Sequence, residues 1–307
     1  MVNPRNETER AMVMMVLAML MLPGIDAIAK WLSGSVSSGQ VTASRFLFQV
    51  LFMFPLLLWT RGAWLTPALW LHAARGTLIA AATLSFFSGL AYLPVADAIS
   101  IFFIEPLLVT LLSAVFLGET VGWRRLLAIA IGFLGALIII RPTFSDVGWP
   151  VLYPVLAAVF FSFYILLTRK LVANEDPVRL QFFAGLFGLL VMGGALAIGT
   201  RNQIGILVTT WPSLTEWTLL AALGFIATIG HLLVVHAFRR APVSVLAPFQ
   251  YVEIIGATIL GFIFFNDFPD PLTWVGIAII VGSGIYVFHR EAVLGRHAGA
   301  QEMIIRE

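Results

Sequence analysis

Cysteine is absent from this chain of 307 residues. The chain therefore has no disulfide framework, no thiolate metal site and no cysteine nucleophile. Charge is also scarce, because Asp, Glu, Lys and Arg make up only 11% of the residues, against about a quarter in a typical soluble domain. The net charge is only +2, which gives no sign of the basic surface that binds nucleic acid. We therefore expect no nucleic-acid partner.

Familiar catalytic motifs are missing as well. The sequence has no GxxxxGK[ST] phosphate-binding loop, so ATP-driven pumping by this chain alone is not expected. HExxH and GxSxG are also missing, which argues against a hydrolase. His231 and His236 are five residues apart, about 140° around a helix, and do not form a shared-face metal pair. We expect no catalytic residue, metal or cofactor, and three classes stay open: a secondary transporter, a channel and a membrane-embedded enzyme of unknown chemistry.

Apolar residues dominate what is present, at 60% of the chain. They recur in runs of about 20 residues, the length that crosses a bilayer as a helix. The sequence therefore predicts an all-α membrane protein with ten transmembrane helices. These helices are expected at about 11–31, 41–60, 71–92, 95–116, 124–141, 149–168, 179–199, 217–238, 243–265 and 272–289. The stretch 200–216 is too short to span and is expected at the membrane interface.

The distribution of positive charge predicts the orientation. With ten spans, both termini lie on one side of the membrane, and 14 of the 18 Lys and Arg residues fall on that side. The opposite side receives Lys30, Arg45, Arg141 and Arg201. Because Lys and Arg are enriched on the cytoplasmic side, both termini are expected in the cytoplasm.

Two segments repeat one pattern. When "VEIIGATILGFIFFND" is set under "IEPLLVTLLSAVFLGE", Glu253 falls on Glu105 and Asp267 on Glu119, with a spacing of 14 in both copies. This equal spacing argues against chance similarity between two apolar segments. Five helices per copy force the second copy to enter the membrane inverted, which is common in secondary transporters. The predicted units are a first repeat, an inverted second repeat and a cytoplasmic tail, at 1–143, 146–290 and 291–307.

Polar residues inside predicted membrane helices are candidates for function. Glu105 and Glu253 lie near the middle of the fourth and ninth predicted helices. A structural role stays equally open for Glu105, because Pro106 frees a backbone carbonyl with which its carboxyl group can bond. The other candidates share a helix face with Glu253 or place hydroxyl, imidazole or aromatic groups at bilayer depth. The expected substrate-binding or translocation residues are Glu253, Glu105, Gln250, His231, Phe249, Ser85, Phe163 and Tyr164.

Asp26 and Lys30 lie four residues apart near the outer end of the first predicted helix. This spacing favours a local ion pair between them. A gate is the alternative interpretation, because Pro23 and Gly24 allow the helix to bend one turn earlier.

Small residues four apart mark the fifth and tenth predicted helices, as Ala128 and Gly132 and as Ala278 and Gly282. Such pairs allow helices to approach closely in a membrane. We expect both helices to serve as scaffold and as a possible homodimer face, with the lipid bilayer and a small-molecule substrate as the other partners.

Ten spans in two fivefold repeats resemble the drug/metabolite transporter superfamily, and specifically its EamA-type members. The run "EPLLVTLLSAVFLGE" matches a pattern of the family's fourth and ninth helices, and Lys30 in "PGIDAIAKWL" matches a lysine at the end of the first. The second copy departs, with Ile254 in place of the proline and Asp267 in place of the last glutamate. Among members, the chain is most similar to the YddG-like bacterial exporters of aromatic amino acids and related metabolites. The resemblance implies a secondary transporter of the bacterial inner membrane that moves amphipathic metabolites, above all amino acids including aromatic ones, outward by alternating access.

Overall fold

The computed structural model describes residues 4–59, 69–117, 122–171, 175–241 and 243–305. Within these ranges the secondary structure is helical, and no strand is found. The helices are α1 (Pro4–Met21), α2 (Pro23–Leu32), α3 (Ser38–Trp59), α4 (Leu69–Leu90), α5 (Val95–Phe102), α6 (Glu105–Leu117), α7 (Trp123–Val147), α8 (Tyr153–Leu171), α9 (Pro177–Arg201), α10 (Leu214–Arg240), α11 (Val243–Gln250), α12 (Val252–Phe265) and α13 (Pro271–Ile305), with short 3-10 turns η1 (Trp149–Leu152) and η2 (Gly205–Leu207).

The described helices account for the ten predicted spans. Seven segments are long and apolar enough to cross a membrane, and they begin at Glu7, Ser38, Leu69, Val95, Trp149, Pro177 and Leu214. Three shorter apolar helices supply the rest, at Leu126–Ile140, Val252–Phe265 and Pro271–Val287. The chain is therefore an all-α membrane protein, as the sequence predicted. The stretch between α9 and α10 carries only the short turn η2.

Three of the spans are interrupted, although the sequence predicted continuous helices. The first is divided at Leu22, between α1 and α2. The fourth is divided after Phe102, where α5 ends two residues before Glu105 begins α6. The ninth is divided at Tyr251, between α11 and α12. Proline removes a backbone donor, and its ring clashes with the carbonyl group of the residue four positions earlier. This accounts for the interruptions that lie directly before Pro23 and shortly before Pro106.

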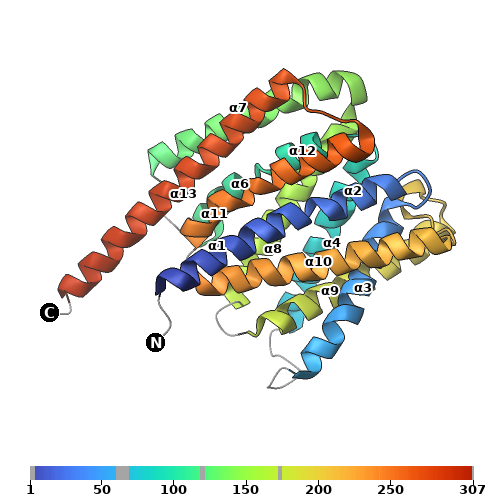
Figure 1. Ribbon diagram of the computed structural model, residues 1–307, viewed down its shortest axis with the longest axis horizontal. Helices are drawn as coiled ribbons and strands as arrows, with labels where there is room; N and C mark the ends of the chain where they lie inside the picture. Colours follow the sequence, from blue (N-terminus) through green and yellow to red (C-terminus); the bar gives the residue numbers. More distant parts are fainter. Residues whose placement is uncertain (1–3, 60–68, 118–121, 172–174, 242, 306–307) are drawn as a thin grey trace.

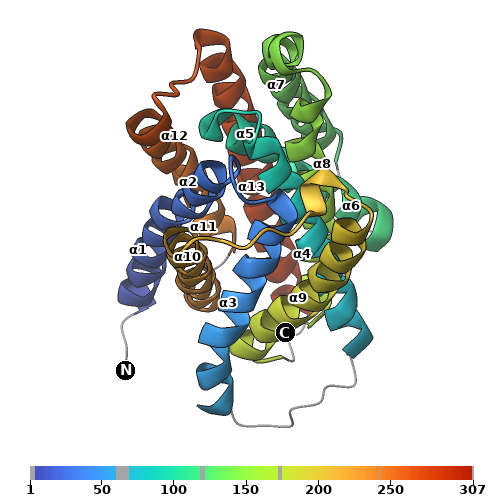
Figure 2. The same cartoon turned by 90° about the vertical axis from the view of Figure 1, so that its right-hand side faces the viewer.

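Helices of the two repeats alternate throughout the molecule. In the first repeat α1 packs against α10, α3 against α9 and α10, and α4 against α8 and α9, all of them from the second. Figure 2 shows α3 with α10 on one side and α9 on the other. Because the main contacts join one repeat to the other, the space enclosed at the centre is shared by both.

The helices α7 and α13 pack side by side along one edge of the molecule (Figure 1). Glycine allows this contact: a Cβ atom on Gly135 would lie 3.0 Å from the Gly276 carbonyl oxygen, and one on Gly276 would lie 2.8 Å from that of Gly135. A Cβ atom on Gly132 would likewise meet Leu107 and Ser283. Gly132, which the sequence analysis placed on a possible homodimer face, thus packs within one chain. Ala128 and Gly282 line a groove between α7 and α13.

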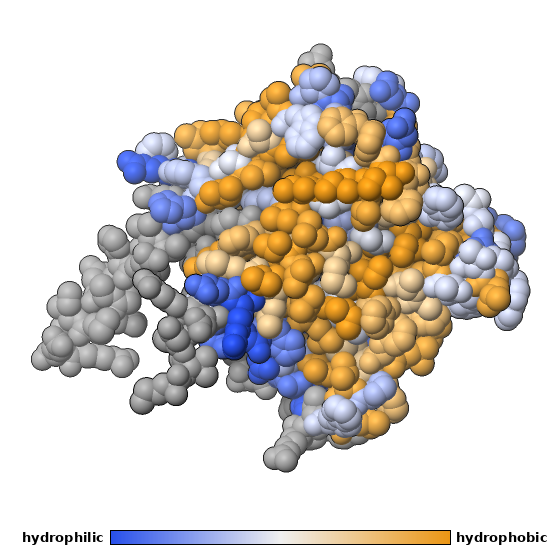
Figure 3. Space-filling model, viewed as in Figure 1, coloured by the Kyte–Doolittle hydropathy of each residue, from blue (hydrophilic) through white to orange (hydrophobic). Residues whose placement is uncertain are grey.

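The outer surface is apolar. Figure 3 shows hydrophobic residues covering the middle of one face and hydrophilic ones gathered toward its periphery. Large apolar side chains exposed on α7 and α12 include Leu134 and Phe264, and Trp211 in the loop before α10 is 92% exposed. Exposed apolar helices flanked by aromatic residues at the ends are typical of contact with lipid.

Candidate functional site

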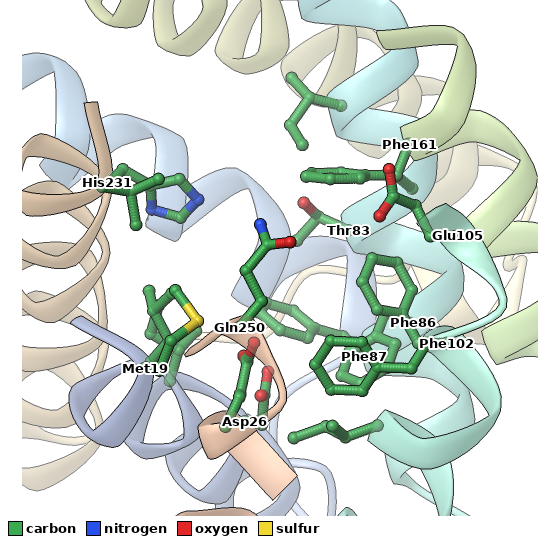
Figure 4. A pocket seen from close by; sticks show the side chains of 18 of the residues that line it. Met19, Asp26, Thr83, Phe86, Phe87, Phe102, Glu105, Phe161, His231 and Gln250 are labelled. Atoms are coloured by element: carbon green, nitrogen blue, oxygen red, sulfur yellow. The ribbon is translucent and has the colours of Figure 1, made fainter. Parts of the chain in front are cut away.

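A cavity of about 200 Å³ lies between the two repeats. Its wall is formed by α1 to α6 from the first repeat and by α8, α10, α11 and α12 from the second. Figure 4 shows side chains of these helices converging on the space from several directions. The lining residues are Met19, Leu22, Ile25, Asp26, Arg45, Ile79, Ala82, Thr83, Phe86, Phe87, Ile99, Phe102, Phe103, Glu105, Phe161, His231, Val234, Gln250 and Glu253.

One wall of the cavity is aromatic. The Phe86 and Phe102 ring centroids lie 5.5 Å apart with the ring planes at 70°, and those of Phe102 and Phe161 lie 5.5 Å apart at 66°. Edge-to-face packing of this kind holds aromatic side chains in a defined arrangement. Figure 4 shows these three rings on one side of the cavity, around Glu105. The wall therefore offers a preformed apolar surface to the flat or branched side chain of a ligand.

Polar side chains line the rest of the cavity. In Figure 4 His231 stands opposite the aromatic wall, and Asp26 and Gln250 project into the space between. The His231 Nδ1 lies 2.7 Å from the Ala227 carbonyl oxygen, so Nδ1 is the donor and Nε2 is left as an acceptor. Nowhere in the described ranges do three or more His, Asp or Glu side chains gather in a way that could hold a metal ion. The cavity lining thus joins aromatic rings with carboxyl, guanidinium, amide and imidazole groups.

Arg45 and Asp26 are the most deeply buried charged residues of the cavity. Arg45 is 5% exposed, and its Nη1 donates a 2.9 Å hydrogen bond to the Thr83 hydroxyl oxygen. Its guanidinium carbon also lies 4.8 Å from the centre of the Phe46 ring. Asp26 is 8% exposed, and its carboxyl group makes no hydrogen bond or ion pair within the described part of the chain. Both side chains thus keep most of their bonding capacity for something inside the cavity.

The position of Arg45 corrects the sequence analysis, which counted it among the charges outside the membrane. Arg45 lies two turns inside α3 and is enclosed by the protein. The sequence carried a signal for this position, since "VTASRFLFQV" places one charge in an apolar run. An arginine inside a membrane helix faces the bundle interior or a cavity. The count of positive charges instead assigned Arg45 to the side of the membrane opposite the termini.

Glu105 and Glu253 line the cavity at equivalent interruptions of the fourth and ninth spans. Glu105 is the first residue of α6, and Glu253 is the second of α12. The two glutamates that the repeat aligned thus lie on the wall of one cavity, one from each repeat. In secondary transporters, interrupted helices of this kind present their half-helix termini to substrate.

The structure separates the other predicted site residues into two groups. Gln250, His231 and Asp26 lie on the cavity wall with the two glutamates. Phe249, Ser85, Phe163 and Tyr164 do not. Phe249 packs among apolar residues of α1 and α10, and the ring of Phe163 meets the ring of Phe116, which is largely exposed at the outer surface.

The physical reason for these corrections is the helical period. One residue along a helix turns its side chain by about 100°, so Phe86 faces the cavity where Ser85 does not, and Phe161 faces it where Phe163 does not. The sequence contains 25 phenylalanines and gives no local signal that distinguishes these rings. The residues missed by the sequence analysis are Arg45, Thr83, Phe86, Phe102 and Phe161.

Lys30 does not form the predicted ion pair with Asp26. Its Nζ instead lies 2.6 Å from Asp267 Oδ2 and donates a 2.9 Å hydrogen bond to the Leu93 carbonyl oxygen. The pair joins α2 of the first repeat to the loop between α12 and α13 of the second. Asp26 turns into the cavity, so Lys30 pairs with Asp267 from the other repeat and not with Asp26 one turn away. Glu119, which the repeat aligns with Asp267, lies outside the described residues.

A second polar contact joins the repeats, on the side opposite Lys30. Arg75 on α4 is 1% exposed, and its Nε donates a 2.9 Å hydrogen bond to the Thr168 hydroxyl on α8. Further contacts reach the Tyr164 hydroxyl at 3.3 Å and the Leu180 carbonyl oxygen on α9 at 3.4 Å. Tyr164 therefore serves this buried cluster and not the cavity wall.

Comparison with known proteins gives a family match over both halves of the chain. The model of the EamA-like transporter family matches residues 9–141 and again residues 148–288. A solved crystal structure superposes with a TM-score of 0.62 at 21% identity, covering 91% of this chain and 98% of the other. The fold seen here is thus shared with a protein of distant sequence.

Three bacterial relatives are similar over most of their length. An "S-adenosylmethionine uptake transporter" of Rickettsia bellii is 28% identical over 87% of this chain and 89% of its own. A "Riboflavin transporter" of Rhizobium johnstonii is 28% identical over 93% and 94%, respectively. A "Pseudopaline exporter" of Pseudomonas aeruginosa is 26% identical over 87% and 91%. These relatives differ in the molecule they are named for, and they include both an importer and an exporter.

Proposed function

This chain belongs to the EamA-like transporter family, and from that premise we propose that it is a secondary transporter of amphipathic metabolites. Within that class we propose amino acids as the substrates, including aromatic ones. They move outward across the bacterial inner membrane by alternating access of the two repeats. Channel or enzyme activity is the alternative.

The observation that carries this proposal is the cavity at the interface of the repeats. It combines a wall of packed phenylalanine rings with buried acidic and basic side chains from other helices. An amphipathic molecule satisfies both parts at once, whereas an inorganic ion leaves the aromatic wall unused. The interrupted fourth and ninth spans support alternating access, because such helices flank the substrate site where two inverted repeats move against each other.

The aromatic wall supports breadth of substrate. An apolar surface distinguishes weakly between molecules of similar size, since one methylene group changes binding by only about 1 to 3 kcal/mol. We therefore expect several apolar and aromatic amino acids to be carried, and charged side chains to be carried poorly.

Transport is tested with purified protein in proteoliposomes and a panel of radiolabelled amino acids. Uptake of L-phenylalanine should saturate, and unlabelled L-phenylalanine preloaded on the opposite side should accelerate it. This acceleration by exchange distinguishes a carrier from a channel, and recovery of chemically unchanged substrate distinguishes it from an enzyme. Transport of a sugar or an inorganic ion by the reconstituted protein, without transport of any amino acid, would contradict the proposal.

The proposed orientation, with both termini in the cytoplasm, is tested by single cysteines, because the native chain has none. Ser35 and Asn202 are exposed in loops on the side opposite the termini, and Glu9 is exposed near the N-terminus. In intact cells, an impermeant thiol reagent should label cysteine at positions 35 and 202 and leave position 9 unlabelled until the membrane is opened. The reverse pattern would show that the termini lie outside.

A further inference from the structure

The cavity contains one buried acidic side chain, Asp26, and one buried basic side chain, Arg45. No ion pair joins Asp26 to Arg45, and within the described ranges neither side chain pairs with any other ionised group. A buried charge is strongly destabilising unless it is paired and hydrogen-bonded. A ligand with both an ammonium group and a carboxylate supplies a charged partner to each of these two side chains.

We infer that the cavity binds its substrate as a zwitterion, with the substrate carboxylate on Arg45 and the substrate ammonium group between Asp26 and Glu253. The apolar part of the substrate then lies against Phe86, Phe102 and Phe161. This inference rests on the proposed function and assigns the groups that recognise each end of the molecule.

Arg45 is prepared to bind a carboxylate. Thr83 occupies one of the five N–H donors of the guanidinium, and the Phe46 ring supports one of its faces. The remaining donors keep the planar fork that binds the two oxygens of a carboxylate together. The side chain is therefore held in place, yet retains the capacity to form a bidentate contact.

The acidic side of the cavity is suited to a substrate amine. Asp26 comes from α2 and Glu253 from α12, and both side chains line the cavity. Within the described residues no lysine or arginine is bound to either carboxyl group. The two groups, which come from different repeats and line one cavity, form an acceptor set for the three N–H donors of an ammonium group. Arg45 lines the same cavity as the two carboxyl groups, so a single small molecule inside it can contact both ends of the site.

The inference is tested by competition against radiolabelled L-phenylalanine in proteoliposome exchange. The competitors are L-phenylalanine, phenethylamine, which lacks the carboxylate, and phenylpropionate, which lacks the amine. For wild-type protein, both incomplete molecules should compete at least tenfold more weakly than L-phenylalanine, because each loses a charge-assisted contact. Absence of L-phenylalanine exchange by wild-type protein would contradict the proposed function and this inference together.

Substitutions then assign each end. Arg45→Gln should weaken competition by L-phenylalanine at least tenfold and leave competition by phenethylamine unchanged. Asp26→Asn should weaken competition by L-phenylalanine at least tenfold and leave competition by phenylpropionate unchanged. Arg124→Gln and Asp146→Asn change exposed side chains outside the cavity and should alter none of the three. Should Arg45→Gln fail to fold, Arg45→Lys retains the charge without the planar fork. It should weaken competition by L-phenylalanine and by phenylpropionate, which both carry a carboxylate, and leave that of phenethylamine unchanged. Equal weakening of all three competitors by an Arg45 variant would show a structural role and overturn the inference, given that wild-type exchange is normal.

Discussion

Replacement of Glu253 with glutamine should lower amino-acid transport at least tenfold while the protein still folds. Glutamine keeps the shape of the side chain and removes its charge. A hydrogen bond to a charged group contributes about 1.5 to 3 kcal/mol, and each 1.4 kcal/mol corresponds to about tenfold in affinity. Glu253 lines the cavity in the first turn of α12, on the wall formed by the second repeat. Initial rates of L-phenylalanine exchange, measured against substrate concentration, check this expectation.

Two further variants define the specificity of the effect. Glu105→Gln should reduce transport less, because an amide replaces a structural carboxyl group beside Pro106 at the start of α6. Glu9→Gln removes a carboxyl group at an exposed position near the N-terminus and should leave transport unchanged. Wild-type rates for Glu253→Gln would reduce Glu253 to a structural hydrogen-bonding residue and remove it from the proposed site.

Replacement of Arg75 with alanine should destabilise the protein by about 2 to 4 kcal/mol, because buried hydrogen-bonding groups lose a partner and a cavity is left behind. The guanidinium ties α4 to Thr168 and Tyr164 on α8 and to the Leu180 carbonyl on α9. Its loss leaves these groups with fewer partners and opens a void at the interface between the repeats. Thermal unfolding in detergent should show a midpoint lower by roughly 5 to 10 °C.

Arg124→Ala is the matched control for this measurement. Arg124 is exposed on α7 and lies over the Trp123 ring, so its removal should change the unfolding midpoint very little. A melting curve for Arg75→Ala that coincides with that of wild type would show that the cluster around Arg75 does not hold the repeats together. A protein that melts normally but transports slowly would instead give Arg75 a role in the transport cycle.

The sequence by itself determined the number of spans and their class. A bilayer imposes a local requirement, since each span needs about 20 apolar residues in succession, and such runs are visible without knowledge of their neighbours. The internal repeat was visible for a similar reason, because Glu105 and Glu253 interrupt otherwise apolar segments at equivalent places. A carboxyl group in an apolar run is a candidate for function by default, and that signal is visible without knowledge of the packing around it.

Tertiary structure alone decided which side chains meet. The rotation of each helix about its axis depends on packing against the other repeat, and it placed Phe161 on the cavity wall and Phe163 outside. Lys30 joined Asp267, 237 residues away, because α2 turns Asp26 inward and presents Lys30 to the loop after α12. Arg45 faces the cavity because the packing of α3 against α9 and α10 sets the rotation of α3 about its axis. The charges that define the proposed zwitterion site lie on helices separated in sequence, and only the interleaving of the two repeats brings them around one space.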